Sequence, residues 1–289
     1  MRNCYFRFDK SLRMGGSVEH FYHFMWGYLL PAAFEYLRNE AARSPRSSTR
    51  FLFRSCGPVM DRRLEEVFNR LSAHFAILGE QQLDDDPSLD VIVLPRWDGW
   101  INLTWKHRAD GLHIDPAELQ PTIEHIRSVR KWLLDRFLLS EQSGRAAPFL
   151  LLKRSAEHAF YAPGGKAEIS GYGTGRRELL GLEAAREQLT KRGIGCEIFE
   201  PGACSLAEQI NAFHASRGLV CMRGAEVANL LWLKPGSKVV LFNPAAAMPV
   251  KSPARVLAHI FELDYEEIDV GSQLRPVLDA ERLAASLLR

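Results

Sequence analysis

The chain lacks the long apolar runs and the one-sided charge that mark whole classes of protein. Among its 289 residues, no apolar run approaches the ~20 residues of a membrane-spanning helix. The net charge is +2, which is too small to point to nucleic acid or, by itself, to a membrane surface. The opening segment MRNCYFRFDKSLR carries charges throughout and lacks the apolar centre of a signal peptide. We therefore expect a cytoplasmic protein without a nucleic-acid partner.

Cysteine is scarce, and the spacings that hold metals are missing. The five cysteines form no Cys-x-x-Cys pair, so a zinc site is not expected. Their odd number and irregular spacing fit reduced thiols that serve as small core residues. No Asp-x-Asp stands at the end of a predicted strand, and the acidic run at 84–86 precedes a strand as a solvated loop. The sequence therefore predicts no metal cofactor.

Helical and strand patterns alternate along the first half. Three segments have apolar residues at helical spacing and are predicted as helices: 20–42, 59–78 and 121–139. Proline is expected to start or kink the first of them at Pro31. Two short apolar runs, 51–55 and 91–95, predict strands. The Trp-rich stretch 96–111 has no clean period and is predicted to be a long functional loop.

The second half alternates in the same way. The predicted strands are 149–154, 193–199, 218–222 and 238–242, and the predicted helices are 176–192, 205–215, 225–233 and 279–288. The glycine-rich stretch 161–177 is expected to be a loop that can close over a ligand. Such alternation favours an α/β fold with a parallel sheet in each half. The polar break SGRAAP suggests two domains, 1–142 and 148–289, with the final helix free to pack back on the first.

The segment after strand 218–222 has the composition of an anion site. In open parallel sheets, ligands bind beyond the carboxyl ends of the strands, and Arg223, Gly224, Ala225 and Glu226 stand at such an end. Small residues let a ligand approach the backbone, a helix start offers free N–H groups, and arginine suits phosphate oxygens. A nucleoside diphosphate would use all three. Glu226 would then accept hydrogen bonds from sugar hydroxyls; alternatively, it complements the helix dipole and pairs with Arg223.

Three blocks of sequence resemble glycosyltransferases of family 61. The most specific is SLAEQINAFHASRGLVCMRGAEVANLLWLKPGSKVVLFNP, and HFYHFMWGYLLP and LLLKRSAEHAF resemble two further motifs in the right order. The matching positions of the first block are Gln209, Ile210, Gly224, Ala225, Asn229, Leu230, Leu231, Pro235, Gly236 and Val239. Two positions depart from the pattern: the family's histidine is Arg223, and its second glycine is Glu226.

The resemblance implies a GT-B fold, in which two Rossmann-like domains face one another across a cleft. It implies that the donor, a nucleotide-sugar, lies on the C-terminal domain and the acceptor mainly on the N-terminal one. It also implies an inverting reaction without a catalytic metal. The implied donor-binding residues are Lys153, Arg154, Gln209, Arg223, Gly224, Ala225, Glu226 and Asn229.

Inversion requires a general base, which should come from the N-terminal domain. Glu19, His20 and His23 would share one face of a helix that begins by residue 19. We favour His20, near the helix start, with Glu19 as its orienting partner or as the base itself; His23 could equally be a core histidine. Asp98 is the further candidate, because it lies between two tryptophans whose rings would stack on a sugar or pack in the core.

The resulting prediction is an inverting glycosyltransferase that modifies a glycan or glycolipid acceptor, a role that allows peripheral membrane association. Two alternatives stay open. One is a non-catalytic protein of the same fold that binds nucleotides or glycans. The other is a different nucleotide-sugar enzyme, such as an epimerase.

Overall fold

A computed structural model describes residues 2–8, 17–41, 49–84, 86–106, 116–139, 147–162, 164–165, 177–248 and 252–289. The chain divides into two compact units, Met1–Arg136 and Phe137–Arg289. Each is built around its own sheet, and every strand pairing in both sheets is parallel. The predicted α/β class with a parallel sheet in each half is confirmed.

The first unit has a four-stranded sheet in the order β3-β2-β1-β4. Its strands are β1 (Arg2–Phe8), β2 (Thr49–Arg54), β3 (Phe75–Leu78) and β4 (Asp90–Leu94). The chain runs outward from β1 to β3 and then returns to the other side of β1. The ends of β1 and β4 therefore form a topological switch point, where open α/β sheets bind ligands.

The described residues of the first unit form seven helical segments. They are α1 (Phe21–Phe24), the π-helical η1 (Met25–Leu29), α2 (Leu30–Ala41), α3 (Pro58–Arg70), α4 (Glu80–Asp84), α5 (Trp97–Lys106) and α6 (Pro116–Phe137), which crosses into the second unit. Aromatic contacts fix α2 and α3 on one sheet face: the ring centroids are 4.4 Å apart for Phe53 and Phe68 and 5.1 Å apart for Tyr36 and Phe51. α4 contributes Leu83 to a small cluster that also contains Tyr5 and Leu52.

The second unit has five strands in the order β6-β5-β7-β8-β9. They are β5 (Phe149–Leu152), β6 (Cys196–Phe199), β7 (Gly218–Met222), β8 (Lys238–Asn243) and β9 (Asp264–Asp269). This is the flavodoxin-like order, with the switch point between β5 and β7. β5, β7 and β8 are buried along almost their whole length, as expected for strands covered on both faces.

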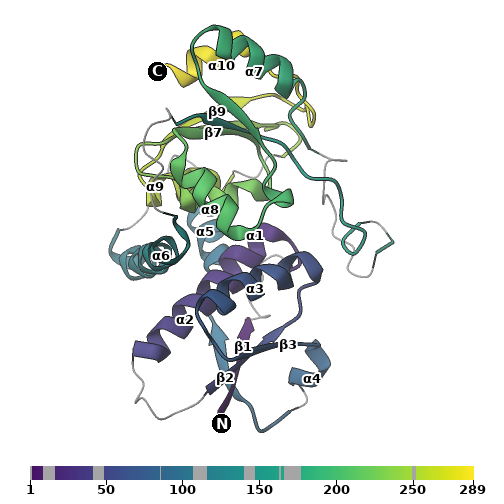
Figure 1. The fold of residues 1–289 in the computed structure, drawn as a ribbon, viewed down its shortest axis with the longest axis vertical. Helices are drawn as coiled ribbons and strands as arrows, with labels where there is room; N and C mark the ends of the chain where they lie inside the picture. The colour runs from purple at the N-terminus through teal and green to yellow at the C-terminus, as the bar shows by residue number, and fades with distance from the viewer. Residues whose placement is uncertain are drawn as a thin grey trace. The chain divides into compact units, whose positions relative to one another are not determined.

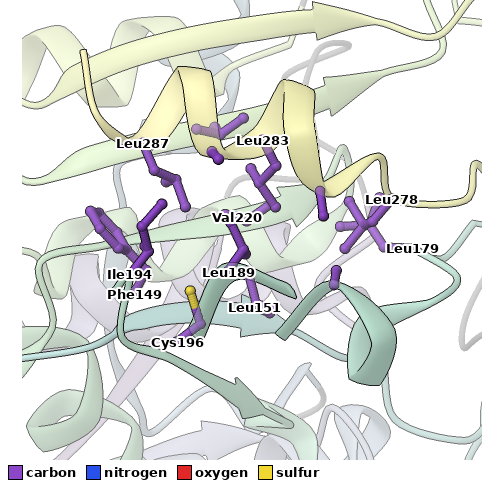
Figure 2. Packing of buried hydrophobic residues seen from close by; sticks show 14 of the residues in the cluster. Phe149, Leu151, Leu179, Leu189, Ile194, Cys196, Val220, Leu278, Leu283 and Leu287 are labelled. Atoms are coloured by element: carbon purple, nitrogen blue, oxygen red, sulfur yellow. The ribbon is translucent and has the colours of Figure 1, made fainter. Parts of the chain in front are cut away.

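Helices cover both faces of this second sheet (Figure 1). α7 (Leu182–Lys191) and α10 (Ala280–Leu287) lie together on one face, and α8 (Leu206–Ala215) and α9 (Ala254–Ile260) lie on the other. Two 3₁₀ segments, η2 (Pro201–Ala203) and η3 (Ala225–Trp232), complete the unit. Figure 2 shows Leu283 and Leu287 of α10 packed with Val220 and Leu189, so the final helix belongs to the core of the second unit.

Two predicted segments were wrong. The helix predicted over 59–78 ends at Arg70, since Ser72 adopts a left-handed conformation (φ 52°) and Phe75–Leu78 pairs with β2 as a strand. The Trp-rich stretch 96–111 is not a loop over its described part: Trp97–Lys106 is helix α5, with Trp97 and Ile101, one turn apart, both buried. Residues 107–111, and most of the predicted loop 161–177, lie outside the described residues.

The first helix is irregular where the sequence suggested it would be. α1, η1 and α2 run on without a break, and the widened π turn ends directly before α2, whose second residue is Pro31. Proline has no N–H to donate and crowds the carbonyl four residues earlier, here that of Gly27. A π segment accommodates that local mismatch. Among the described helices, none is long and apolar enough to cross a membrane.

Candidate active site

The carboxyl end of β4 carries a buried ion pair. After Leu94 the chain turns into α5, and Arg96 donates from Nε to Asp98 Oδ1 (2.8 Å) and from Nη2 to Asp98 Oδ2 (2.6 Å). The two side chains are 3% and 0% exposed. Burial alone would raise the pKa of Asp98, but the hydrogen bonds from Arg96 and His23 outweigh it and hold the pKa below its usual value. Asp98 is therefore an ionised, acceptor-only carboxylate.

His23, at the end of α1, contacts this carboxylate from the other side. Its Nδ1 lies 2.8 Å from Asp98 Oδ2, although the two residues are 75 positions apart in the chain. Because Asp98 can only accept, the proton of a neutral His23 must sit on Nδ1, and Nε2 keeps its lone pair. The imidazole is 21% exposed whereas Asp98 is fully buried. A partly open histidine oriented by a closed carboxylate is the arrangement of a general base with its partner.

The two other candidates of the first unit, His20 and Glu19, have different surroundings: the His20 ring is close to His23, and Glu19 pairs with Arg54. His20 is the N-cap residue of α1, and its ring centroid is 5.5 Å from that of His23. Glu19 binds Arg54 at the end of β2 (Oε1 to Nη2, 2.6 Å) and accepts a hydrogen bond from Ser17. The structure therefore brings His23 together with Asp98, and Glu19 together with Arg54.

The second unit places an ion pair at its own switch point. Arg154, just after β5, donates from Nε to Glu226 Oε1 (2.7 Å) and from Nη1 to the carbonyl of Arg177 (3.0 Å). Glu226 folds back over Gly224: a Cβ on Gly224 would lie 2.3 Å from Glu226 Oε2 and 3.3 Å from Arg154 Nη2. The space that a small residue leaves at this turn is thus occupied by the protein's own carboxylate.

Arg223 is buried beneath this turn. It is 7% exposed, and its Nη1 donates to Asn243 Oδ1 (3.1 Å) and to the carbonyl of Met248 (2.9 Å). Both acceptors are uncharged, and Asn243 in turn donates to Glu267 (2.5 Å). Burial lowers the pKa of Arg223, opposed by the negative charge of Glu267. The ends of β7 and β8 therefore hold a buried guanidinium whose two described acceptors, Asn243 Oδ1 and the carbonyl of Met248, carry no formal charge.

Of the remaining donor-side candidates, Lys153 is exposed, Ala225 begins a helical segment, and Gln209 and Asn229 are buried in the second unit. Lys153 is largely exposed and pairs with Glu200 (2.8 Å). Ala225 begins η3, a 3₁₀ rather than an α-helix. Gln209 and Asn229 are each 1% exposed, and Gln209 Nε2 donates to the carbonyls of Pro201 (2.7 Å) and Cys204. The structure thus uses Gln209 to brace η2 from within.

The described residues contain no group of three or more His, Cys, Asp or Glu side chains that could hold a metal ion.

Comparison with known families decides the class. Residues 21–240 match the model of the glycosyltransferase 61 family. The chain belongs to this family. A comparison with curated proteins finds no match. The family 61 match begins in α1 and ends in β8, so it contains the His23–Asp98 pair and the residues Arg154, Arg223 and Glu226 of the second unit.

The sequence did not point to three residues that contribute to these two clusters, namely Gly27, Arg96 and Asn243. For Arg96 and Asn243 the sequence did contain a usable signal, their position at the end of a predicted strand. Arg96 directly follows the predicted strand 91–95 and Asn243 the predicted strand 238–242, so the strand-end rule used for Arg223 applies to both. Gly27 gave no such signal, because its role depends on a π turn that periodicity does not reveal.

Proposed function

We propose that this family 61 glycosyltransferase moves a sugar from a nucleotide-sugar donor to a glycan or glycolipid acceptor, with inversion and without a catalytic metal. The observation that carries the proposal is the His23–Asp98 pair at the switch point of the first sheet. In a GT-B arrangement the first unit would serve the acceptor and the second the donor. Localisation in the cytoplasm and peripheral association with a membrane belong to the same proposal.

His23 is the proposed base. The acceptor hydroxyl oxygen attacks the anomeric carbon while the bond from that carbon to the phosphate oxygen breaks, and the diphosphate leaves with the electron pair. Nε2 of His23 takes the hydroxyl proton as the new bond forms. The resulting imidazolium is stabilised by Asp98, which accepts from Nδ1. Proton transfer of this kind contributes roughly 10²–10⁴ in rate.

The second unit is proposed to hold the departing diphosphate. Arg154 and Arg223 supply positive charge, and the backbone of Gly224, Ala225 and Glu226 lies at the end of β7. Fixed positive groups aimed at developing negative charge stabilise a leaving group without reorganisation. Gln209 and Asn229 are proposed to act from within, by fixing the backbone around the donor.

A direct test measures nucleotide-sugar consumption with and without acceptor sugars, after a thermal-shift screen of UDP, GDP and their sugar conjugates. A ligand that binds the native state raises its apparent stability. A transferase turns over at useful rates only when the acceptor is present. Turnover without acceptor would indicate an epimerase-type enzyme, and stabilisation without any turnover would indicate the non-catalytic binding protein.

Glu226→Gln is expected to tighten the binding of the free nucleoside diphosphate at least about fivefold. Glutamine keeps a hydrogen bond to Arg154 but removes a like charge, and such a contact near 4 Å costs roughly 1 kcal/mol even at the dielectric constant of water. Isothermal titration with UDP and GDP measures the dissociation constant of each diphosphate for wild type and variant. If Glu226 also accepts from a sugar hydroxyl, the nucleotide-sugar gains less than the diphosphate does. Weaker diphosphate binding in the variant would disprove the idea that the Glu226 carboxylate repels the diphosphate.

Transfer is expected to persist in EDTA, because the arginines at the ends of β5 and β7 supply the positive charge that Mg²⁺ or Mn²⁺ would otherwise provide. The assay compares initial rates after dialysis against EDTA with rates after each metal is added back. A loss of activity that Mn²⁺ restores would contradict this prediction and make Glu226 the first suspected ligand.

A further inference from the structure

We propose that Arg96 is a positioning residue that acts through Asp98 on His23, and that Gly27 provides the space for it. The inference rests on the proposed function, in which His23 is the base. Arg96 occupies both Asp98 oxygens, through Nε and Nη2, while Oδ2 also receives His23 Nδ1. The guanidinium thereby fixes the plane of the carboxylate, and the carboxylate fixes the tautomer of the imidazole.

Arg96 adds to what Asp98 alone would do. Its side chain has no exposure to solvent, and a buried carboxylate without a cation either protonates or moves toward water. A protonated Asp98 could donate a hydrogen bond to Nδ1, which would place the histidine proton on Nε2 and remove the basic nitrogen from the reaction. Arg96 prevents that outcome because it keeps the carboxylate ionised at any pH near neutrality.

Arg96 is held between two regular elements, β4 before it and α5 after it. Arg96 follows β4 after a single residue, Pro95, and its carbonyl accepts the N–H of Trp100 in the first turn of α5. Asp98 lies in that same first turn, where the helix dipole favours a negative charge. The ion pair is therefore built within one strand-to-helix turn, and only His23 comes from a distant segment.

The arrangement requires a residue without a side chain at position 27. A Cβ at position 27 would lie 2.7 Å from Asp98 Oδ1 and 2.8 Å from Arg96 Nε. Gly27 sits in the middle of the π segment Met25–Leu29, one turn after His23. His23 and Gly27 thus lie one turn apart on the same helical segment: His23 contacts Asp98, and the missing side chain of Gly27 leaves room for the ion pair. A single added methyl group at position 27 should therefore displace Asp98 from His23.

The test combines ¹⁵N NMR of the His23 side chain with steady-state kinetics on the full-length protein. The variants are Arg96→Gln, Arg96→Lys and Gly27→Ala, and the His23 signals are assigned from their loss in His23→Gln. In wild type we expect the neutral form of the ring to carry its proton on Nδ1. Arg96→Gln and Gly27→Ala should populate the Nε2–H tautomer and lower kcat at least about tenfold with KM changed less than about threefold. Arg96→Lys should restore part of both readouts.

Arg63→Gln is the matched control, because Arg63 is also a buried arginine of the first unit and binds Glu66 (3.0 and 2.9 Å). It should lower stability without changing the His23 tautomer. Should Arg96→Gln fail to fold, Gly27→Ala carries the test. An unchanged Nδ1–H tautomer in whichever of Arg96→Gln and Gly27→Ala folds, or a raised KM with unchanged kcat, would overturn the inference. The tautomer readout does not need turnover, so it remains decisive even if the transferase activity is absent.

Discussion

His23→Ala is expected to lower kcat by about 10²–10⁴-fold, the usual contribution of a positioned general base, and to leave the Kd for nucleoside diphosphate within about twofold. The reason is the division of the chain: the imidazole and its carboxylate belong to the first unit, while the proposed diphosphate ligands belong to the second. The measurement is kcat with saturating donor and acceptor, together with calorimetric titration of the diphosphate.

The companion variants decide which first-unit residue is the base. Asp98→Asn should be nearly as damaging as His23→Ala, because an amide can donate to Nδ1 and so place the proton on the wrong nitrogen. His20→Ala should cost less than His23→Ala, since the described contact to the buried carboxylate belongs to His23. Glu19→Gln should act mainly through its pair with Arg54. If His20→Ala is inactive and His23→Ala keeps over a third of the wild-type kcat, the base is His20, as the sequence alone suggested.

The sequence predicted the sheets better than the site, for a physical reason. Runs such as FLLL and GLVCM are buried on both faces, so their composition alone indicates central parallel strands. β9 (DYEEID) gave no such signal, because an edge strand can carry acidic side chains toward solvent. β1 is a central strand and was also missed, because it begins with the exposed Arg2 and its buried residues are interrupted by the exposed Arg7.

The candidate site required contacts that no local pattern encodes. The sequence named both His23 and Asp98 but could not pair them, because only the switch point of the sheet brings positions 75 residues apart to 2.8 Å. Periodicity also placed Asp98 in a loop, whereas it lies in the first turn of α5. On the donor side, the motif pointed to Arg223 and Glu226 together, but Glu226 pairs with Arg154 from another strand end instead.

Arg154→Ala is expected to weaken nucleoside diphosphate binding by about 1.5–3 kcal/mol, or roughly 10- to 150-fold, the range for losing a charged hydrogen bond. Two effects act in the same direction: a guanidinium that can reach phosphate is lost, and Glu226 is left as an unpaired negative charge beside Gly224. Lys153→Ala is the matched control, because Lys153 is the adjacent residue but is exposed and paired with Glu200. Its effect should stay within about twofold, as for most exposed ion pairs.

The double variant Arg154→Ala/Glu226→Ala separates these two effects. It removes the repelling carboxylate together with its partner, so any binding still lost relative to Glu226→Ala measures what Arg154 itself contributes to the phosphate. Arg223→Ala should also weaken binding by about 1.5–3 kcal/mol. It should in addition lower the free energy of unfolding by about 1–3 kcal/mol, since Asn243 Oδ1 and the carbonyl of Met248 lose their donor. If the Arg154 single and double variants both bind UDP and GDP as tightly as wild type, while Arg223→Ala changes only the unfolding free energy, the diphosphate does not bind at the ends of β5 and β7.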